Sequence, residues 1–128
     1  MSKIKTIYIA GPMSGYPQFN FPAFFAAQKV LESQGWKVYN PAQKDLEASL
    51  DPTSVVTGDA KKAIAAGFDF REAFGWDLDK VIRSDAVYML RGWEHSPGAK
   101  AEHAAATAMQ KHYPEYEIHY ETAYLSHP

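Results

Sequence analysis

The sequence predicts an α/β fold: an open, doubly wound parallel sheet of four to five strands, with helices on both faces in three layers. Short runs of β-branched, aromatic and apolar residues alternate with segments that repeat apolar residues at helical spacing. Their order is strand, helix, strand, helix, strand, helix, strand, which implies right-handed βαβ units. With 128 residues, of which 46% are hydrophobic, residues 1–128 are expected to form one domain around one core.

The first third of the chain contains two predicted strands and one helix. Residues 5–11 are β-branched and apolar up to a Gly-Pro pair, which predicts a buried, central strand. A helix follows, with Asn20 as its N-cap, Pro22 in its first turn and Gly35 just past its end. Residues 36–41 are then expected to form a second short strand that ends at a proline.

The middle of the chain, residues 43–68, has the weakest pattern. We expect a loop over 50–59 and a helical turn or two over 60–67, so that the whole segment forms a mobile or lid-like insertion. Residues 70–84 regain helical spacing and predict a helix, with Gly75 as a weak point inside it.

The last third predicts a strand, a helix and another strand. Residues 85–90 form a buried strand. Residues 96–112 form a helix, because Ser96 suits the N-cap and Pro97 suits the first helical position. Residues 116–120 are expected to form the fourth strand.

Composition excludes several classes of protein. The chain has no Cys, so it holds neither a disulfide nor a zinc-thiolate site. Its formal net charge of -2 argues against a dedicated binder of nucleic acid or of an anionic membrane. No apolar run approaches the roughly 20 residues that cross a bilayer, and the apolar start is too short for a signal peptide, so a cytoplasmic protein is expected. The five His are never four residues apart and no HExxH motif occurs, so no metal site is expected.

In a sheet of this kind the ligand crevice lies at the carboxyl ends of the strands, near the point where the strand order changes direction. The loop 11–15 and the loop 91–98 should therefore lie side by side. Backbone N–H groups of Met13 to Gly15 could face an anion there, although a generic tight turn is the alternative. Trp93 could stack on a planar ring of a ligand, or pack in the core or in an interface.

Three side chains are candidates for chemistry in this crevice. Glu102 lies in the second turn of its helix, where it leans back toward the crevice and the helix macrodipole favours its ionised form. An ionised carboxylate beside a sugar suits attack on an acetal-like carbon, but a solvated surface glutamate is the alternative. Asp77 is either a second carboxyl that donates a proton or a helix N-cap. The Tyr8 hydroxyl could hydrogen-bond a carboxylate or simply pack, and Asp85 is expected to hold neighbouring backbone N–H groups.

The stretches YIAGPMSG, NFPAF, GWKVYNPA, WDLDKVIRSDAVYML and GWEHSPGAKAE resemble the nucleoside 2-deoxyribosyltransferase superfamily. Within it, the chain is most similar to a branch of short bacterial and phage proteins that share a GW-E-x-S-x-GA-x-x-E pattern. The resemblance covers residues 6–41 and 70–111, and it implies a flavodoxin-like domain that needs no cofactor and no metal. Such sites are often completed by a neighbouring subunit, so the resemblance also implies a homodimer or a larger homo-oligomer.

The resemblance also implies roles for individual residues. Glu102 matches the nucleophile that attacks the sugar C1′, Asp77 matches the aspartate that delivers a proton or positions the substrate, and Tyr8 matches the tyrosine that orients the nucleophile. The substrate would be bound by two groups of residues, from the two loops: Gly11, Pro12, Met13, Ser14 and Gly15, and Trp93, Ser96 and Gly98.

Ser96 decides which substrate the resemblance favours. Transferases of free nucleosides tend to carry Asp at this position, whereas deoxynucleoside 5′-monophosphate N-glycosidases carry Ser, and a neutral helix N-cap suits a dianion better than a carboxylate does. The glycosidases, however, place an Arg where this chain has Ser14, and Pro12 has no N–H to donate. A phosphate would then depend on Ser14, Ser96, loop N–H groups and either His95 or Arg71.

The expected function is therefore hydrolysis of the base–sugar bond of a (deoxy)nucleoside 5′-monophosphate through a glycosyl-enzyme intermediate. The expected partner is a small nucleoside or nucleotide, with no nucleic acid and no membrane. Two alternatives stay open: a nucleoside 2-deoxyribosyltransferase that exchanges bases, and a nucleotide-binding module without catalysis.

Overall fold

The computed structural model describes residues 4–47 and 52–121. A parallel four-stranded sheet forms its centre, in the order β2-β1-β3-β4. The strands are β1 (Thr6–Ala10), β2 (Lys37–Tyr39), β3 (Ala86–Met89) and β4 (Glu117–Tyr120). The sheet confirms the predicted α/β architecture, and all four predicted strands lie where the sequence placed them.

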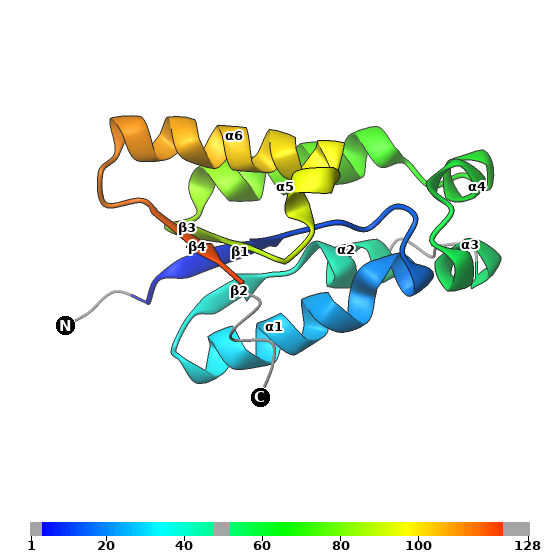
Figure 1. The fold of residues 1–128 in the computed structure, drawn as a ribbon, viewed down its shortest axis with the longest axis horizontal. Helices are drawn as coiled ribbons and strands as arrows, with labels where there is room; N and C mark the ends of the chain where they lie inside the picture. Colours follow the sequence, from blue (N-terminus) through cyan, green and yellow to red (C-terminus); the bar gives the residue numbers. More distant parts are fainter. Residues whose placement is uncertain (1–3, 48–51, 122–128) are drawn as a thin grey trace.

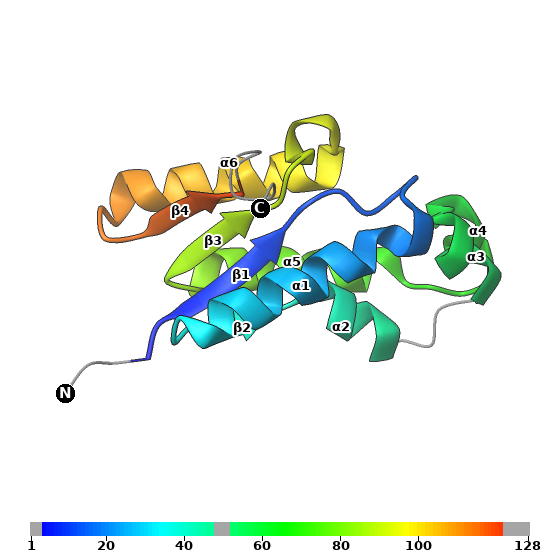
Figure 2. The same ribbon diagram turned by 60° about the horizontal axis from the view of Figure 1, so that its bottom comes forward.

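Helices cover both faces of the sheet, as Figures 1 and 2 show. On one face lie α1 (Phe21–Ser33) and α2 (Pro41–Glu47), and on the other face lie α5 (Phe70–Arg83) and α6 (Pro97–His112). Two shorter helices, α3 (Pro52–Thr57) and α4 (Ala60–Ala65), lie together at one end of the molecule, beyond the carboxyl end of β1 (Figure 1). The three layers match the predicted flavodoxin-like arrangement.

The two hydrophobic layers follow from the alternation of side chains along β1. Ile7 and Ile9 point to the α1 face and pack with Phe24 and other apolar residues. Tyr8 and Ala10 point to the opposite face, where they pack with side chains of α5 and α6. Because these four residues of β1 are fully buried, a shift of register by one residue would exchange the two layers. The strand thereby fixes Tyr8 on the α6 side.

The start of β3 is tied to β1 by Asp85. Its Oδ2 accepts hydrogen bonds from the backbone N–H of Thr6, at 2.8 Å, and from the Thr6 hydroxyl, at 3.1 Å. This arrangement confirms the structural role expected of Asp85, since the aspartate holds a backbone N–H of the neighbouring strand. The helix α5 also matches its predicted range and runs through Gly75 without a break.

The turn before α1 differs from the prediction. Asn20 occupies the N-cap position, but its side chain does not cap the helix. Instead its Nδ2 donates to the carbonyl oxygen of Pro12 at 3.0 Å, and the backbone of Gln18, Phe19 and Asn20 is left-handed over the turn η1 (Pro17–Asn20). Each such non-glycine residue costs roughly 1–2 kcal/mol, which the burial of Phe19 and the Asn20 hydrogen bond offset. Asn20 thus ties the loop to α1 rather than capping α1.

The middle segment is more helical than predicted. Residues 52–57 form α3, where a loop was expected, whereas α4 confirms the expected helical turns after residue 59. The helix α2 begins at Pro41, because Asn40 Oδ1 accepts from the N–H of Ala42 at 2.8 Å and so caps it. The parts of the loop prediction at residues 50 and 51 lie outside the described residues, and the lid-like mobility of the segment stays a prediction.

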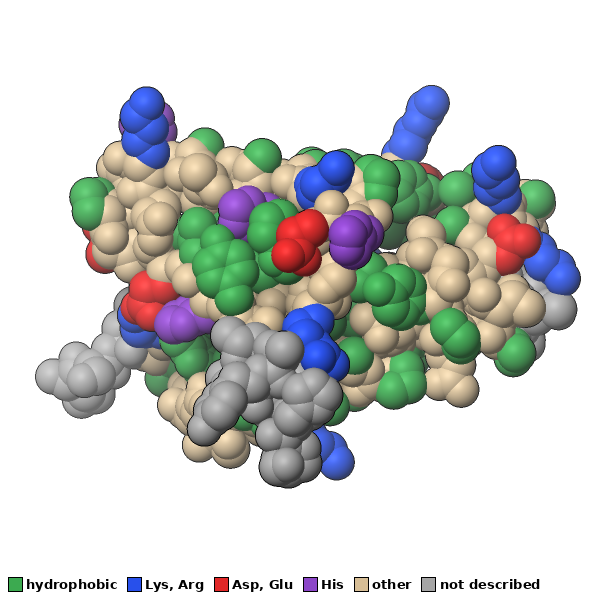
Figure 3. Space-filling view, in the orientation of Figure 1, with side chains coloured by type: hydrophobic (Ala, Val, Ile, Leu, Met, Phe, Trp, Pro, Cys, Tyr) green, Lys and Arg blue, Asp and Glu red, His purple; other side chains and the backbone are tan. Residues whose placement is uncertain are grey.

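The surface carries mixed charge. On the face drawn in Figure 3, Lys and Arg side chains are interspersed with acidic, histidine and uncharged side chains. Across the described ranges 4–47 and 52–121, no helix is long and apolar enough to cross a membrane.

Two glycines with positive φ provide a test of how α3 and α4 are attached. Gly58 (φ +72°) approaches Tyr16 so closely that a Cβ would lie 1.9 Å from the Tyr16 carbonyl oxygen, whereas a Cβ on Gly67 (φ +109°) would meet open space. We expect Gly67→Ala to lower the free energy of unfolding by about 1–2 kcal/mol, from backbone strain alone. Gly58→Ala should cost about 2 kcal/mol more, because the backbone must also move. If urea unfolding gave equal losses of unfolding free energy for the two variants, the close contact between Gly58 and Tyr16 would be contradicted.

Candidate functional site

The loops after β1 and β3 meet at the carboxyl end of the sheet. A Cβ on Gly11 would lie 2.7 Å from Leu90 Cβ, and a Cβ on Gly92 would lie 2.8 Å from the Tyr16 hydroxyl oxygen and 3.3 Å from Pro12 Cγ. A Cβ on Gly11 would therefore force Leu90 to move, and Gly92 is favoured by its φ of +89° as well as by these side chains. The strand order changes direction between β1 and β3, so the crevice lies where open α/β sheets bind ligands. The expectation that the two loops lie side by side is confirmed.

A cavity of about 330 Å³ opens between these loops and the helices α5 and α6. This volume is at the lower end of the range typical of small-molecule sites, about 300–1,000 Å³. Several of the residues expected to bind or act on a substrate line it together: Tyr8, Gly11, Pro12, Met13, Ser14, Asp77, His95, Ser96, Gly98 and Glu102. The fold thus gathers on one cavity residues that are far apart in the sequence.

Glu102 and Tyr8 form the buried centre of this cavity. The Tyr8 hydroxyl donates a hydrogen bond to Glu102 Oε2 at 2.8 Å. Tyr8 is fully buried and Glu102 is only 5% exposed, so Glu102 is not a solvated surface residue. The hydrogen bond confirms that the Tyr8 hydroxyl contacts a crevice carboxyl group. Glu102 reaches Tyr8 because helical side chains lean toward the N-terminus of their helix, which here faces the crevice.

The ionisation of Glu102 differs from the expectation. Burial raises the pKa of Glu102 well above its usual value, the charge of Asp77 raises it further, and the Tyr8 hydrogen bond lowers it only in part. A helix macrodipole contributes roughly 0.3–1 kcal/mol and acts within the first turn, whereas full burial of a carboxyl shifts its pKa by several units. Burial therefore raises the pKa of Glu102, whereas the macrodipole was expected to favour its ionised form.

Asp77 lies in the middle of α5 and lines the same cavity. It is not the N-cap of this helix: Asp69 is, since its Oδ1 accepts from the N–H of Glu72 at 3.0 Å. Burial raises the pKa of Asp77 to about 8, and the charge of Asp45 contributes next, while the Tyr8 hydroxyl lowers it. Asp77 Oδ1 is buried and has no hydrogen-bond partner among the described residues. An acid that holds its proton at neutral pH is suited to donate it.

Asp45 is a third buried acid that the sequence analysis did not single out. It is 8% exposed, and burial raises its pKa to about 7 while Lys44 lowers it. The signal was present on α2, where the buried residues Pro41, Ala42 and Asp45 share one face of the helix. An acid on the buried face of an amphipathic helix points to a site, but this helix was itself not predicted.

The loop residues divide into those that reach the cavity and those that do not. Ser96 confirms its predicted place as N-cap of α6, because its Oγ accepts from the N–H of Ala99 at 3.2 Å. The Gly15 N–H donates to the carbonyl oxygen of Gly58 at 2.8 Å, so it does not face an anion as expected. Arg71 is exposed and lies outside the residues that line the cavity, whereas His95 is one of them.

The aromatic side chains of the cavity are not those expected. Trp93 stacks on His103, with ring centroids 4.2 Å apart, and packs against Tyr120, which favours the packing alternative for this residue. Phe70 and Phe74 line the cavity instead, stacked on each other with centroids 5.6 Å apart and an interplanar angle of 9°. Phe70 is 47% exposed, so the first turn of α5 offers a flat apolar surface at the cavity.

No three His, Asp or Glu side chains within 4–47 and 52–121 are arranged to hold a metal ion. The acids instead form a coupled set, since the charges of Asp77 and Asp45 each raise the pKa of Glu102. What the arrangement offers is a carboxyl that could attack, a second carboxyl that could supply a proton, and a hydroxyl that orients the first.

The three buried acids give the protein an unusual dependence of stability on pH. The folded protein holds the protons of Asp45 and Asp77 up to about pH 7 and about pH 8, whereas an unfolded chain releases aspartate protons near pH 4. Between these values the folded state binds more protons than the unfolded state, so the free energy of unfolding should fall as pH rises from about 4 to about 8. Each one-unit change in pKa corresponds to about 1.4 kcal/mol, so the fall should reach several kcal/mol in urea unfolding.

The matched variants are Asp77→Asn and Asp79→Asn, which make the same change two residues apart on α5. Asp77→Asn should reduce the slope of this fall over the whole range, because it removes one buried acid whose pKa is about 8. Asp79 pairs with Arg83 at 2.7 Å on the surface, so Asp79→Asn should leave the slope unchanged. A stability that is constant or rises over this pH range would contradict the burial of ionisable acids.

Comparison with known proteins places the chain in a family. A family model described as a domain of unknown function, DUF4406, matches residues 5–113. This range contains Tyr8, Asp77 and Glu102 and both loops of the crevice. Neither the curated proteins nor the solved structures gave a match. Because the family model covers most of the chain, the protein belongs to the DUF4406 family.

Proposed function

We propose that the protein hydrolyses the N-glycosidic bond of a (deoxy)nucleoside 5′-monophosphate, with Glu102 as the nucleophile. The observation that carries the proposal is the buried Tyr8–Glu102 hydrogen bond beside Asp77, inside a cavity at the carboxyl end of the sheet. The resemblance of the chain to the nucleoside 2-deoxyribosyltransferase superfamily supports the same assignment, since Glu102, Asp77 and Tyr8 match its motif positions.

The reaction would proceed in two steps that retain the configuration at C1′. In the first, a Glu102 carboxylate oxygen forms a bond to C1′ while the bond from C1′ to the base nitrogen breaks. The base leaves with that electron pair and takes a proton from Asp77. In the second, water attacks C1′, its proton passes to Asp77, and the ester bond to Glu102 breaks to restore the carboxylate.

The two acids need opposite protonation states for this reaction. The Tyr8 hydroxyl donates to Glu102 and so favours the ionised form of that residue, whereas Asp77 Oδ1 is buried without a partner and its pKa is about 8. One proton shared by the pair would thus reside on Asp77. The positive charge that develops on the sugar in the transition state favours an ionised Glu102, and this attraction is strong in a cavity that excludes water.

The substrate's phosphate is assigned to the start of α6. The neutral Ser96 caps this 16-residue helix, and the macrodipole at its N-terminus favours a dianion. His95 and Ser14 line the same cavity and could contribute polar contacts.

Two other functions compete with hydrolysis. A transferase would resolve the same intermediate with a second base, so incubation with a deoxynucleoside and a different free base would yield the exchanged nucleoside. A binding module without catalysis would release no base and would still bind its ligand after Glu102→Ala. The pairing of a buried carboxyl with a second, protonated acid favours catalysis over binding alone.

Glu102→Gln tests the nucleophile. The amide cannot attack C1′, so release of free base, measured by chromatography, should fall by at least about 10³-fold. Its oxygen can still accept from Tyr8, so the free energy of unfolding should change by no more than about 1–2 kcal/mol. Glu115→Gln is the control, because it makes the same change at an exposed position just after α6, and it should keep full activity. An unaltered rate in Glu102→Gln would end the proposal.

Ser96→Asp tests the phosphate. Asp is as good an N-cap as Ser, so the free energy of unfolding should stay within about 0.5 kcal/mol. The new carboxylate should repel a dianion, so kcat/KM for the 5′-monophosphate should fall by about tenfold or more while that for the free nucleoside is unchanged. Equal losses for the two substrates would show that the phosphate does not bind at this helix.

A further inference from the structure

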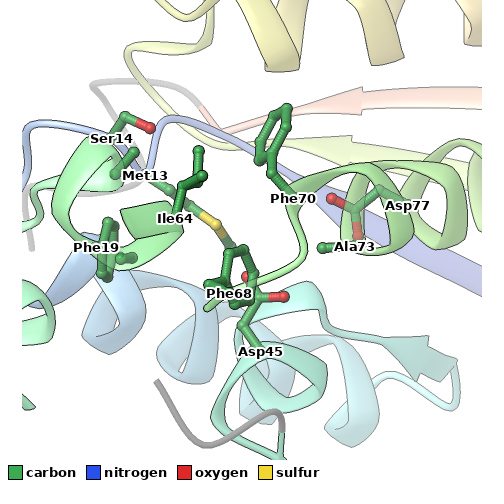
Figure 4. Close-up of a pocket in the computed structure, with 11 residues that line it drawn as sticks. Met13, Ser14, Phe19, Asp45, Ile64, Phe68, Phe70, Ala73 and Asp77 are labelled. Atoms are coloured by element: carbon green, nitrogen blue, oxygen red, sulfur yellow. The ribbon is translucent and has the colours of Figure 1, made fainter. Parts of the chain in front are cut away.

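A second, smaller cavity adjoins the first on the side of α2 and α4. It measures about 70 Å³, enough for one edge of a ligand but not for a whole nucleotide, and Figure 4 shows the side chains around it. Asp77, Met13 and Phe70 line both cavities, so the smaller one opens from the crevice next to the proposed acid. A group attached to the substrate at the crevice could therefore extend into it.

Two carboxyl groups reach this cavity from different helices. Figure 4 shows Asp45 on α2 and Asp77 on α5, both at the cavity, with Phe68 and Ile64 among the apolar side chains between the helices. Asp45 Oδ1 and Asp77 Oδ1 are both buried, and neither has a hydrogen-bond partner among the described residues. Asp45 is more than nine-tenths buried, so water does not readily replace the missing partner.

A buried polar oxygen without a partner costs free energy that a hydrogen-bond donor would recover. Among the described residues that line the cavity, Ser14 alone, apart from the two acids themselves, has a side chain that can donate a hydrogen bond as a neutral group, and there is no Lys, Arg or His, so a donor on a ligand would satisfy these oxygens. The remaining surface is apolar, with Phe19, Phe68 and Met13 among its side chains, which suits the edge of a flat ring. The matching chemical group is an N–H donor carried on an aromatic heterocycle.

We propose that Asp45 recognises the exocyclic amino group of the substrate's base, and so selects amino-bearing bases over their oxo counterparts. This inference rests on the proposed function, because the base must lie beyond Asp77 when C1′ faces Glu102. Above about pH 7, where Asp45 loses its proton, an amino group donates to its carboxylate, whereas an oxo group at the same place sets one acceptor against another and leaves both unpaired. Asp45 thereby becomes a residue that determines specificity, on a helix that carries no other proposed site residue.

The test compares substrates that differ in this one group. The adenine and hypoxanthine 2′-deoxynucleoside monophosphates form one pair, and the cytosine and uracil monophosphates form the other. The wild-type protein should favour the amino member of at least one pair by about tenfold or more in kcat/KM. Asp45→Asn should reduce this preference to near parity, because an amide can turn its N–H toward an oxo group. Asp45→Ser, a smaller replacement, should also remove the preference if the amide packs poorly.

Glu47→Gln is the matched control, since it makes the same change of acid to amide on an exposed position of the same helix. It should keep the wild-type preference. If both members of a pair are hydrolysed and their ratio is the same in wild type and Asp45→Asn, this inference is overturned and the proposed function stands.

Absence of base release from every substrate would overturn the proposed function, and binding of free bases then decides the inference separately. Calorimetric titration should show adenine or cytosine binding at least about tenfold more tightly than hypoxanthine or uracil, with the difference lost in Asp45→Asn. No binding, or binding that ignores the substitution at Asp45, would overturn the inference as well.

Discussion

The hydrogen bond between Tyr8 and Glu102 is the interaction on which the candidate site depends. It joins the central strand β1 to α6 through two buried polar groups, at 2.8 Å, in a layer that is mostly apolar and in which Asp77 lies close to both groups. Either group alone would be a buried polar atom without a partner, which is costly, so the pair holds the register of the strand and the rotation of the helix together. The alternation of side chains along β1 and the lean of side chains on α6 aim the two groups at each other. The loops of the crevice then surround a Tyr8–Glu102 pair whose position the fold determines.

Near this hydrogen bond, three acids lie close enough for the charges of Asp77 and Asp45 to raise the pKa of Glu102. Asp45, Asp77 and Glu102 come from three different helices, and the pKa of each is raised first of all by burial. A protein selected only for stability would replace such groups with apolar residues, because a buried acid must stay protonated or lose folding free energy. Perturbed acids that gather at a cavity are typical of functional sites. The cost in stability is therefore best understood as a consequence of what the cavity binds or does.

The sequence predicted the parts of this structure that local pattern determines. The four strands and the long helices have strong periodicity, and strand order and helix geometry directed Tyr8 and Glu102 toward one crevice, while their pairing was one of the alternatives left open. The sequence could not predict features that depend on contacts between distant residues. The Gly15 N–H donates to the Gly58 carbonyl oxygen, and the Trp93 ring stacks on His103. The helix α2, which was not predicted, buries Asp45 next to the crevice. The macrodipole argument for an ionised Glu102 left out burial, which depends on the whole fold and raises the pKa of this residue.

Recognition and proton delivery would be coupled if Asp45 accepts a hydrogen bond from the base. A donor at Asp45 favours its ionised form. The charge of Asp45 is the second cause, after burial, of the raised pKa of Asp77, but it is the smallest of the causes that raise the pKa of Glu102. An amino group bound at Asp45 would therefore help to hold the proton on Asp77, while the charge of Asp45 also raises the pKa of Glu102. The correct base would thus prepare the acid that its own departure requires, and a base without the amino group would leave Asp77 less fully protonated.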